Sequence, residues 1–433
     1  MNSAPYGANG RGNRPSALSS ETWPFRLEDL PERVYLVGGA VRDALLDRAS
    51  EYLDLDFVLP NNAVETAREL AKRYRAGFVL LDAERQIARA VFANGTADFA
   101  LQEGDNLDAD LRRRDFTVNA IAYNPHTGQL IDPLQGSEDL QRGWLRMVSP
   151  DNLQDDPLRL LRAYRQAAQL GFSLESETQR AIRQFAPRLS RVAAERVNSE
   201  LSYLLKMPQG TPWLLAALAD GVLGSWFPSA TVEGAMRGRD VDRAADRSSE
   251  LYPEFAAELS RDLRSTLRAN WVTVAKLACL VSDDADIAYR ELMRLKYSRA
   301  EIRSVVTVLQ AWQSVNSAEA IAQLSVSDLF FWFKSVGAVF PAFALFAVAS
   351  GIELEAIAPL IDRFVNPDDP VAHPQPLVDG KTLMMALNLS KGPHIGRLLT
   401  AIQIARACGQ IATAQEAIEF ARSELDHLGQ STL

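Results

Sequence analysis

The sequence predicts an α+β fold, with a small mixed α/β head followed by an elongated neck, body and tail that are all α-helical. Short β-prone runs bounded by turn residues occur in the head, for example at 87–92. From about residue 210 onward, apolar residues recur at helical spacing, as in Ser327–Val336. Strands followed only by helices are typical of α+β proteins. The expected strands of the head lie at 34–37, 78–81, 87–92 and 97–100, and a helix capped by Asn62 is expected to run to about Tyr74.

The composition is that of an ordinary globular protein. Of 433 residues, 47% are hydrophobic and 23% are charged, which suits about two to four domains. Cys279 and Cys408 lie in apolar helical segments, which predicts buried free thiols and an intracellular protein. We find no apolar run of bilayer length, so we expect no membrane contact and a cytoplasmic location.

The net charge of −9 is unfavourable for nucleic-acid binding, but the charge is unevenly distributed. From Pro157 to Lys206 there are nine Lys or Arg against four Glu. A local basic surface is what phosphate contacts need, although a solvated helix surface has the same composition.

Composition and periodicity divide the chain into four parts. The first part is rich in Gly, Ser, Asn and Pro, which is typical of a disordered tail. The expected parts are the tail at 1–22, a mixed α/β head at 23–148, a helical neck at 149–210, and a helical body and tail at 211–433.

Two aspartates in the head have the spacing of a metal site. Asp54 and Asp56 are separated by one residue, so on a β-strand both side chains lie on the same face. Adjacent carboxylates repel one another unless a cation lies between them, and a pair of Mg²⁺ ions is the usual arrangement in phosphoryl and nucleotidyl transfer. The alternative is an edge strand with a solvated acidic face.

A glycine turn precedes these aspartates. The run from Val34 to Val37 is β-prone, Gly38-Gly39 makes a tight turn, and the next residues predict a helix from Ala40 to Leu46. A strand, a glycine turn and a helix N-terminus together form a phosphate cradle.

The segment DLRRRDFTVNAIAYN, from Asp110 to Asn124, contains a second polar group. On a helix, Asp115 and Asn119 share a face and present an acceptor and an amide that suit a ribose. Arg114 suits a phosphate. The alternative is a charged helix start.

Together these segments resemble the class II tRNA nucleotidyltransferase and bacterial poly(A) polymerase family of the polymerase-β-like superfamily. The matching strings are LVGGAVRD followed by DLD, then RRDFT-x-NA, and DDPLRLLRAYR from Asp155. The resemblance implies that Asp54 and Asp56 hold two catalytic Mg²⁺ ions with help from Asp98 on the last strand of the head. It also implies nucleotide binding by Gly38, Gly39, Arg42, Arg114, Asp115 and Asn119.

The DDPLR segment resembles the motif in which an Asp and an Arg three residues later act as a protein template. Asp156 can only accept hydrogen bonds and Arg159 can only donate them, so the pair matches cytosine and adenine and mismatches uracil and guanine. Arg162 is expected at the nucleotide and Arg165 at the RNA 3′ end, unless both are only ion-paired at the surface. The segment IDPLQGSEDLQRGWLRMV resembles a third motif, in which we expect a structural role for Asp132 and Asp139. Lys381, Lys391 and Arg397 in the tail are suited to an RNA backbone.

The expected function is addition or repair of the 3′-terminal CCA of tRNA from CTP and ATP, without a nucleic-acid template. Full CCA-adding enzymes have a flexible loop between the third carboxylate strand and RRDFT, whereas only FALQEGDNLDADL lies there in this chain. A CC-adding enzyme working with a separate A-adding enzyme is therefore the alternative. A poly(A) polymerase is disfavoured, because the strand region lacks the basic cluster of that subtype. An inactive RNA-binding scaffold would have no reason to retain this set of metal, ribose and base groups.

Overall fold

The computed structural model describes residues 16–48, 52–261 and 269–430, and the chain divides into two compact units. The first unit comprises residues up to Val192 together with Asp220–Val222, and the second comprises Ala193–Ala219 and Leu223–Leu433. Most of the expected neck thus groups with the head, whereas its last helix, α8 (Ala194–Lys206), belongs to the second unit. The expected tail lies outside the described residues up to residue 15, and a 3-10 turn, η1 (Ser20–Thr22), is present in its remainder.

A seven-stranded sheet forms the centre of the first unit, with strand order β3-β4-β5-β2-β1-β6-β7. Its neighbouring strands are antiparallel except for β2 and β5, which are parallel. The strands are β1 (Tyr35–Val37), β2 (Leu53–Leu59), β3 (Gly77–Asp82), β4 (Ile87–Phe92), β5 (Gly95–Leu101), β6 (Ala122–Asn124) and β7 (Gln129–Ile131), with a separate pair β8 (Trp144–Leu145) and β9 (Ser173–Leu174). The mixed head sheet and the strands at 78–81, 87–92 and 97–100 are confirmed.

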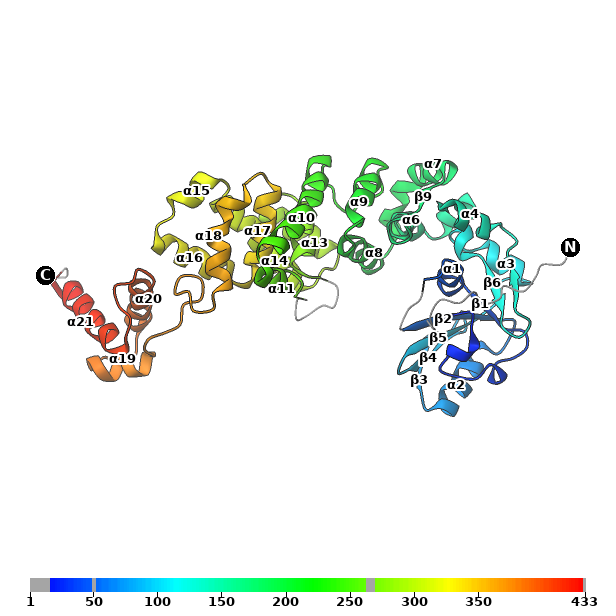
Figure 1. The fold of residues 1–433 in the computed structure, drawn as a ribbon, viewed down its shortest axis with the longest axis horizontal. Coiled ribbons are helices and arrows are strands. Elements are labelled where there is room, and N and C mark those ends of the chain that lie inside the picture. Colours follow the sequence, from blue (N-terminus) through cyan, green and yellow to red (C-terminus); the bar gives the residue numbers. More distant parts are fainter. Residues whose placement is uncertain (1–15, 49–51, 262–268, 431–433) are drawn as a thin grey trace. The chain divides into compact units, whose positions relative to one another are not determined.

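The helices of the first unit surround this sheet and continue beyond it. Figure 1 shows α2 on one face of the sheet and α1 on the other. The described helices are η1, η2 (Leu27–Asp29), α1 (Gly39–Leu45), α2 (Ala63–Tyr74), α3 (Leu107–Arg112), η3 (Thr117–Asn119), α4 (Gly136–Arg142), α5 (Pro150–Asp155), α6 (Leu158–Leu170), α7 (Ser176–Phe185) and η4 (Ala186–Arg191). Asn62 precedes α2 as expected, although its side chain makes no capping hydrogen bond.

The core of the head lies between α2 and the sheet. Phe57 on β2 and Phe99 on β5 are buried and stack with ring centroids 5.1 Å apart. Ala88 and Ala90 on β4 face the same side and are also fully buried. Because side chains alternate along a strand, residues 54, 56, 89 and 98 lie on the opposite face of the sheet.

Carboxylates hold the segments around η3 and α4 in place through hydrogen bonds. Asp139 accepts hydrogen bonds from the Thr117 hydroxyl at 2.7 Å and from Nε of Arg146. Asp132 accepts from the backbone N–H of Gly136 and of Ser137, each at 2.8 Å, at the start of α4. The expected structural role of Asp132 and Asp139 is confirmed: Asp139 fixes η3, which carries Asn119.

The last piece of the first unit is a short return segment, Asp220–Val222. The Asp220 carboxylate accepts from the Tyr164 hydroxyl at 2.6 Å, from Gln179 at 2.8 Å and from Nε of Arg183 at 2.6 Å. These bonds attach the segment to α6 and α7.

The second unit is α-helical throughout its described residues. Its helices are α8, α9 (Gly210–Ala219), α10 (Val232–Leu251), α11 (Pro253–Leu259), α12 (Trp271–Ala278), α13 (Ala285–Arg294), α14 (Arg299–Ser314), α15 (Ala318–Gln323), α16 (Val326–Val336), η5 (Gly337–Val339), α17 (Phe340–Ala349), α18 (Leu354–Val365), α19 (Gly380–Leu387), α20 (Pro393–Ala407) and α21 (Ala414–Gln430). The predicted α+β class is therefore confirmed.

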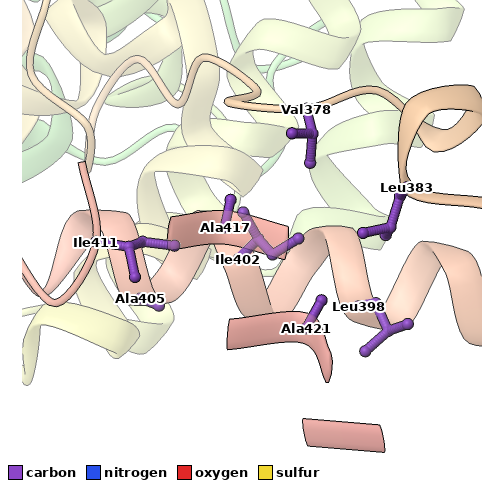
Figure 2. Close-up of a cluster of buried hydrophobic side chains, with 8 residues drawn as sticks. All are labelled: Val378, Leu383, Leu398, Ile402, Ala405, Ile411, Ala417 and Ala421. Atoms are coloured by element: carbon purple, nitrogen blue, oxygen red, sulfur yellow. The ribbon is translucent and has the colours of Figure 1, made fainter. Parts of the chain in front are cut away.

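The final three helices have a small core of their own. Figure 2 shows eight buried side chains, including Leu383 of α19, Ile402 of α20 and Ala421 of α21. Their burial leaves the basic residues of this region on the outside: Lys381, Lys391 and Arg397 are all exposed.

Two expectations from the sequence were wrong in this unit. The first was that the chain contains no apolar run of bilayer length. Residues Val326–Ala349 are long and apolar enough to cross a bilayer, although 61% of that apolar window is buried inside the protein, as in a core helix. Cys279 is buried as expected, and burial raises the pKa of its thiol to about 12. Cys408 was expected to be buried but is exposed, and it directly follows the last residue of α20.

Candidate active site

Asp54 and Asp56 lie side by side on the face of β2 that is turned away from α2. The intervening Leu55 and the following Phe57 are buried at 0% and 1% exposure, so the core fixes which face the carboxylates occupy. The parallel partner β5 places Thr96 beside Asp54 and Asp98 beside Asp56. The Thr96 hydroxyl donates to Oδ1 of Asp54 at 2.5 Å. Asp54, Asp56 and Asp98, which we call the carboxylate cluster, thus lie on two neighbouring strands.

The charge of the carboxylate cluster is only partly balanced by protein groups. Burial, followed by the charges of Asp54 and Asp98, raises the pKa of Asp56 to about 7, against smaller opposing effects of Arg114 and Arg89. A carboxyl group with such a raised pKa is one that a bound cation would stabilise in its ionised form.

Asp98 is already paired with an arginine. Both of its oxygens accept from Arg89 of β4, at 2.6 Å from Nε and 2.7 Å from Nη2. The structure therefore places Asp98 beside Asp56, as expected, but with a protein cation on both oxygens.

The glycine turn between β1 and α1 lies directly against the cluster. Gly38 has φ +73°, a conformation that favours glycine, and a Cβ there would lie 3.4 Å from Nη1 of Arg114 and 3.6 Å from Oδ2 of Asp56. This close approach brings the backbone of the turn within reach of any group bound at the aspartates.

A second polar cluster, which we call the Asp115 network, consists of Arg42, Asp115, Asn119, Arg162 and Gln166. The amide nitrogen of Asn119 donates to Oδ1 of Asp115 at 2.9 Å and to Gln166 at 2.8 Å, and its oxygen accepts from Nη1 of Arg42 at 2.8 Å. Arg162 donates to Oδ2 of Asp115 from Nη2 at 2.9 Å.

In this network, a neighbouring positive charge and hydrogen bonds affect the pKa of Asp115 more than burial does. Burial alone would raise the pKa of Asp115, but the Arg162 guanidinium and the bonds from Asn119, Arg162 and the Phe116 backbone lower the pKa to about 2. The expected helix carrying Asp115 and Asn119 was wrong: α3 ends at Arg112, and a separate turn, η3, begins at Thr117. The two side chains nevertheless meet, because the turn folds Asn119 back onto Asp115.

A cavity of about 470 Å³ joins the two clusters. Ten predicted site residues line it: Gly38, Gly39, Arg42, Asp54, Asp56, Arg114, Asp115, Asn119, Arg162 and Arg165. Asp98, Asp156 and Arg159 do not line it. The cavity therefore combines carboxylates, a glycine turn and a hydrogen-bonding network in a volume that suits a small charged ligand.

The comparisons with known proteins agree with this geometry. Residues 34–146 match the family described as "Poly A polymerase head domain", 171–233 match "Probable RNA and SrmB- binding site of polymerase A", and 266–421 match "tRNA nucleotidyltransferase domain 2 putative". A CC-adding tRNA nucleotidyltransferase of Synechocystis sp. is 49% identical over 92% of this chain and 95% of its own. The chain belongs to the tRNA nucleotidyltransferase family.

Other relatives carry different subtype names. An A-adding tRNA nucleotidyltransferase of Deinococcus radiodurans is 33% identical over 91% of this chain and 96% of its own. Among solved structures, a CCA-adding enzyme in complex with ATP has a TM-score of 0.71 and 23% identity, covering 90% of this chain and 91% of that chain. That likeness shows a shared fold.

The nucleotidyltransferase family implies a divalent metal ion, and Asp54 and Asp56 of the carboxylate cluster fit one. Asp54 and Asp56 supply hard oxygen donors whose charge is incompletely balanced. Within the described ranges, no group of three or more His, Cys, Asp or Glu side chains has the arrangement of a metal site. Two carboxylates completed by substrate phosphates are a common way to hold such an ion in this class of enzyme.

The expected template pair lies where α5 meets α6. Oδ1 of Asp156 accepts from the Leu158 backbone N–H at 3.3 Å. Nη1 of Arg159 donates to the Asn152 carbonyl at 3.0 Å, and the Asn152 amide donates to the carbonyls of Arg112 and Arg114, each at 2.8 Å. Arg159 is thus connected to the loop that carries Arg114.

Sequence reasoning missed three residues that complete these clusters. Gln166 is 2% exposed and joins Asn119 to Asp115; its spacing of four residues from Arg162 on α6 was the available signal. Thr96 and Arg89 depend on strand register, which a single sequence does not reveal. Arg42, expected to bind the nucleotide, is 6% exposed, and its guanidinium is bonded to Asp43 and Asn119.

Proposed function

We propose that this protein is a CC-adding tRNA nucleotidyltransferase, which transfers two cytidine nucleotides from CTP to the tRNA 3′ end without a nucleic-acid template. The observation that carries the subtype is the short connection between β5 and α3, residues 102–106. The 49% identical relative named as a CC-adding enzyme supports the same choice.

That connection is held in place as well as short. The Glu103 backbone N–H donates to Oδ1 of Asp110 at 3.0 Å, and the Glu103 side chain pairs with Arg113. Asp110 also accepts from Arg114 at 3.1 Å. A segment tied to α3 in this way is unsuited to the large loop movement that switches a pocket from CTP to ATP.

The proposed reaction takes place at the carboxylate cluster. Asp54 and Asp56 would hold Mg²⁺, and the bound ion would lower the pKa of the RNA 3′-hydroxyl and balance the negative charge of the triphosphate. Asp98 supports these carboxylates. Gly38 and Gly39 bring bare backbone N–H groups to the triphosphate, and Arg114 supplies a positive charge beside them.

The Asp115 network holds the sugar of the incoming nucleotide. Asp115 and Asn119 line the cavity and are held in place by Arg42, Arg162 and Gln166, so they would contact the ribose with little loss of side-chain entropy. We assign Arg42 to supporting Asn119, because its guanidinium is committed to two protein acceptors. This role differs from the direct nucleotide contact expected from the sequence.

Base choice is assigned to Asp156 and Arg159. An acceptor beside a donor matches cytosine, and uracil would leave both groups unpaired. Arg165, which donates to Gln169 at 2.8 Å beside the cavity, is assigned to the RNA 3′ end.

We assign RNA binding to the second, α-helical unit. Lys381, Lys391 and Arg397 are exposed around α19 and α20 and suit the phosphate backbone of the tRNA. The proposed location is the cytoplasm, and a separate A-adding enzyme would complete the CCA end.

The test supplies the purified protein and Mg²⁺ with tRNAs ending at the discriminator base, at C and at CC, with CTP, ATP or both. We expect growth that stops at CC even when ATP is present. Completion to CCA would show a full CCA-adding enzyme, and addition of A alone to the CC end would show the A-adding subtype. Asp54→Ala protein is the matched control, and it should add nothing to any of the three tRNAs.

A further inference from the structure

Arg89 is a cation beside the carboxylate cluster whose place is set by the sheet. It lies on β4 opposite Asp98 of β5, and Asp98 in turn lies opposite Asp56 of β2. The neighbouring Ala88 and Ala90 are fully buried on the α2 face, so Arg89 must lie on the carboxylate face. Its direction is therefore fixed by the core and not by the ion pair alone.

The contact between Arg89 and Asp98 is bidentate. Nε and Nη2 reach the two carboxylate oxygens at 2.6 Å and 2.7 Å, and the side chains are 37% and 16% exposed. A planar guanidinium fork matches both oxygens and fixes the plane of the carboxylate, which an ammonium group cannot do.

The pair also changes the charge that a metal ion meets. Three carboxylates gathered on two strands repel one another, and Arg89 balances one of them from the β4 side. The charge left for a divalent ion is then mainly that of Asp54 and Asp56. Arg89 and a bound cation are both positively charged and lie near the same carboxylate, so they repel each other.

We propose that Arg89 is a positioning residue for the carboxylate cluster: it fixes the orientation of Asp98 and weakens the affinity for the divalent ion. This inference rests on the proposed function, since it takes Asp54 and Asp56 as the metal-holding residues. Two effects of opposite sign follow. Loss of the arginine charge tightens metal binding. Loss of the bidentate guanidinium contact leaves Asp98 free to rotate and slows the chemical step.

The test measures Mn²⁺ binding to the nucleotide-free protein by electron paramagnetic resonance, and measures kcat for C addition at saturating CTP. For Arg89→Met we expect the Mn²⁺ Kd to fall about three- to tenfold through loss of one nearby positive charge. We expect kcat to fall by at least about tenfold through misorientation of Asp98. For Arg89→Lys we expect a Kd near that of the wild type with kcat still lowered.

Arg85→Met is the matched control, because Arg85 is an exposed arginine on the same β-hairpin. It should leave Kd and kcat unchanged. The proposal would be overturned if the Mn²⁺ Kd of Arg89→Met were equal to or higher than that of the wild type. A wild-type kcat in both Arg89 variants would overturn it as well. If Arg89→Met melts below the assay temperature, the separation of Kd from kcat in Arg89→Lys decides.

The Asp54→Ala, Asp56→Ala double variant separates this inference from the proposed function. It should lose Mn²⁺ binding. If it loses binding but the Arg89 variants behave as wild type, the positioning role is wrong and the metal assignment stands. If it still binds Mn²⁺ as the wild type does, the metal assignment fails and the positioning proposal fails with it.

Discussion

The carboxylate cluster and the Asp115 network border the same cavity but are balanced in opposite ways. In the first, burial and neighbouring negative charges raise the pKa of Asp56 to about 7. In the second, hydrogen bonds and Arg162 overcome burial and lower the pKa of Asp115 to about 2. The protein satisfies the Asp115 network by itself and leaves the carboxylate cluster to be completed by a ligand.

This difference agrees with the proposed roles, in which the carboxylate cluster carries the reaction and the Asp115 network holds the sugar. A fully bonded network is rigid before the substrate arrives, so it suits a sugar that must be oriented. A cluster with excess negative charge is costly without a cation, so it suits a metal-dependent reaction. Substitutions in the two clusters should therefore have opposite effects on stability.

The largest expected effect comes from the carboxylate cluster. Asp54→Ala should reduce C addition by about 10³-fold or more, because one of the two carboxylates proposed to hold the metal ion is lost. The melting temperature should stay the same or rise, since a repelling charge is removed. Activity is measured by primer extension and stability by thermal melting, with tRNA binding by filter retention as the control for an intact surface. A variant active at the wild-type rate would refute the metal assignment.

A substitution in the Asp115 network should instead lower stability. Asn119→Ala removes the acceptor for Arg42 and a donor to Asp115, both buried, and should lower the free energy of unfolding by roughly 1–3 kcal/mol. Urea unfolding measures this loss. The control Asn61→Ala changes an exposed residue and should shift stability by less than about 0.5 kcal/mol. Equal losses in the two variants would mean that the network adds nothing to stability.

Acid should weaken the same network. The pKa of Asp115 is lowered from its usual 3.8 to about 2 in the folded protein, so its contribution is present above pH 3.8 and is lost as the pH falls toward 2. The lost stability is roughly 2 kcal/mol. Urea unfolding between pH 6 and pH 2 should show a smaller decline for Asp115→Asn than for the wild type. Parallel curves would contradict the assignment of the acid sensitivity to Asp115.

Local pattern predicted the carboxylates better than it predicted their surroundings. The alternation around Asp54 and Asp56 was sufficient to place both on one face, because Leu55 and Phe57 must be buried. The pairing of Asp98 with Arg89 depends on strand register, which is set by packing across the sheet. Asp115 and Asn119 were brought together correctly but for the wrong reason, since the chain turns there instead of forming one helix.

The smallest expected effect concerns the template pair, which lies outside both clusters. Arg159→Ala should lower the ratio of kcat/KM for CTP over UTP by about tenfold, because the donor that rejects uracil is lost. Arg159 also holds the Asn152 carbonyl, and Asn152 holds the backbone of Arg114, so the same change should loosen the loop that carries Arg114. Arg159→Lys keeps a donor and serves as the control. Equal loss of kcat/KM for both nucleotides would show that Arg159 only supports this loop, whereas a changed ratio at unchanged stability would assign it to the base.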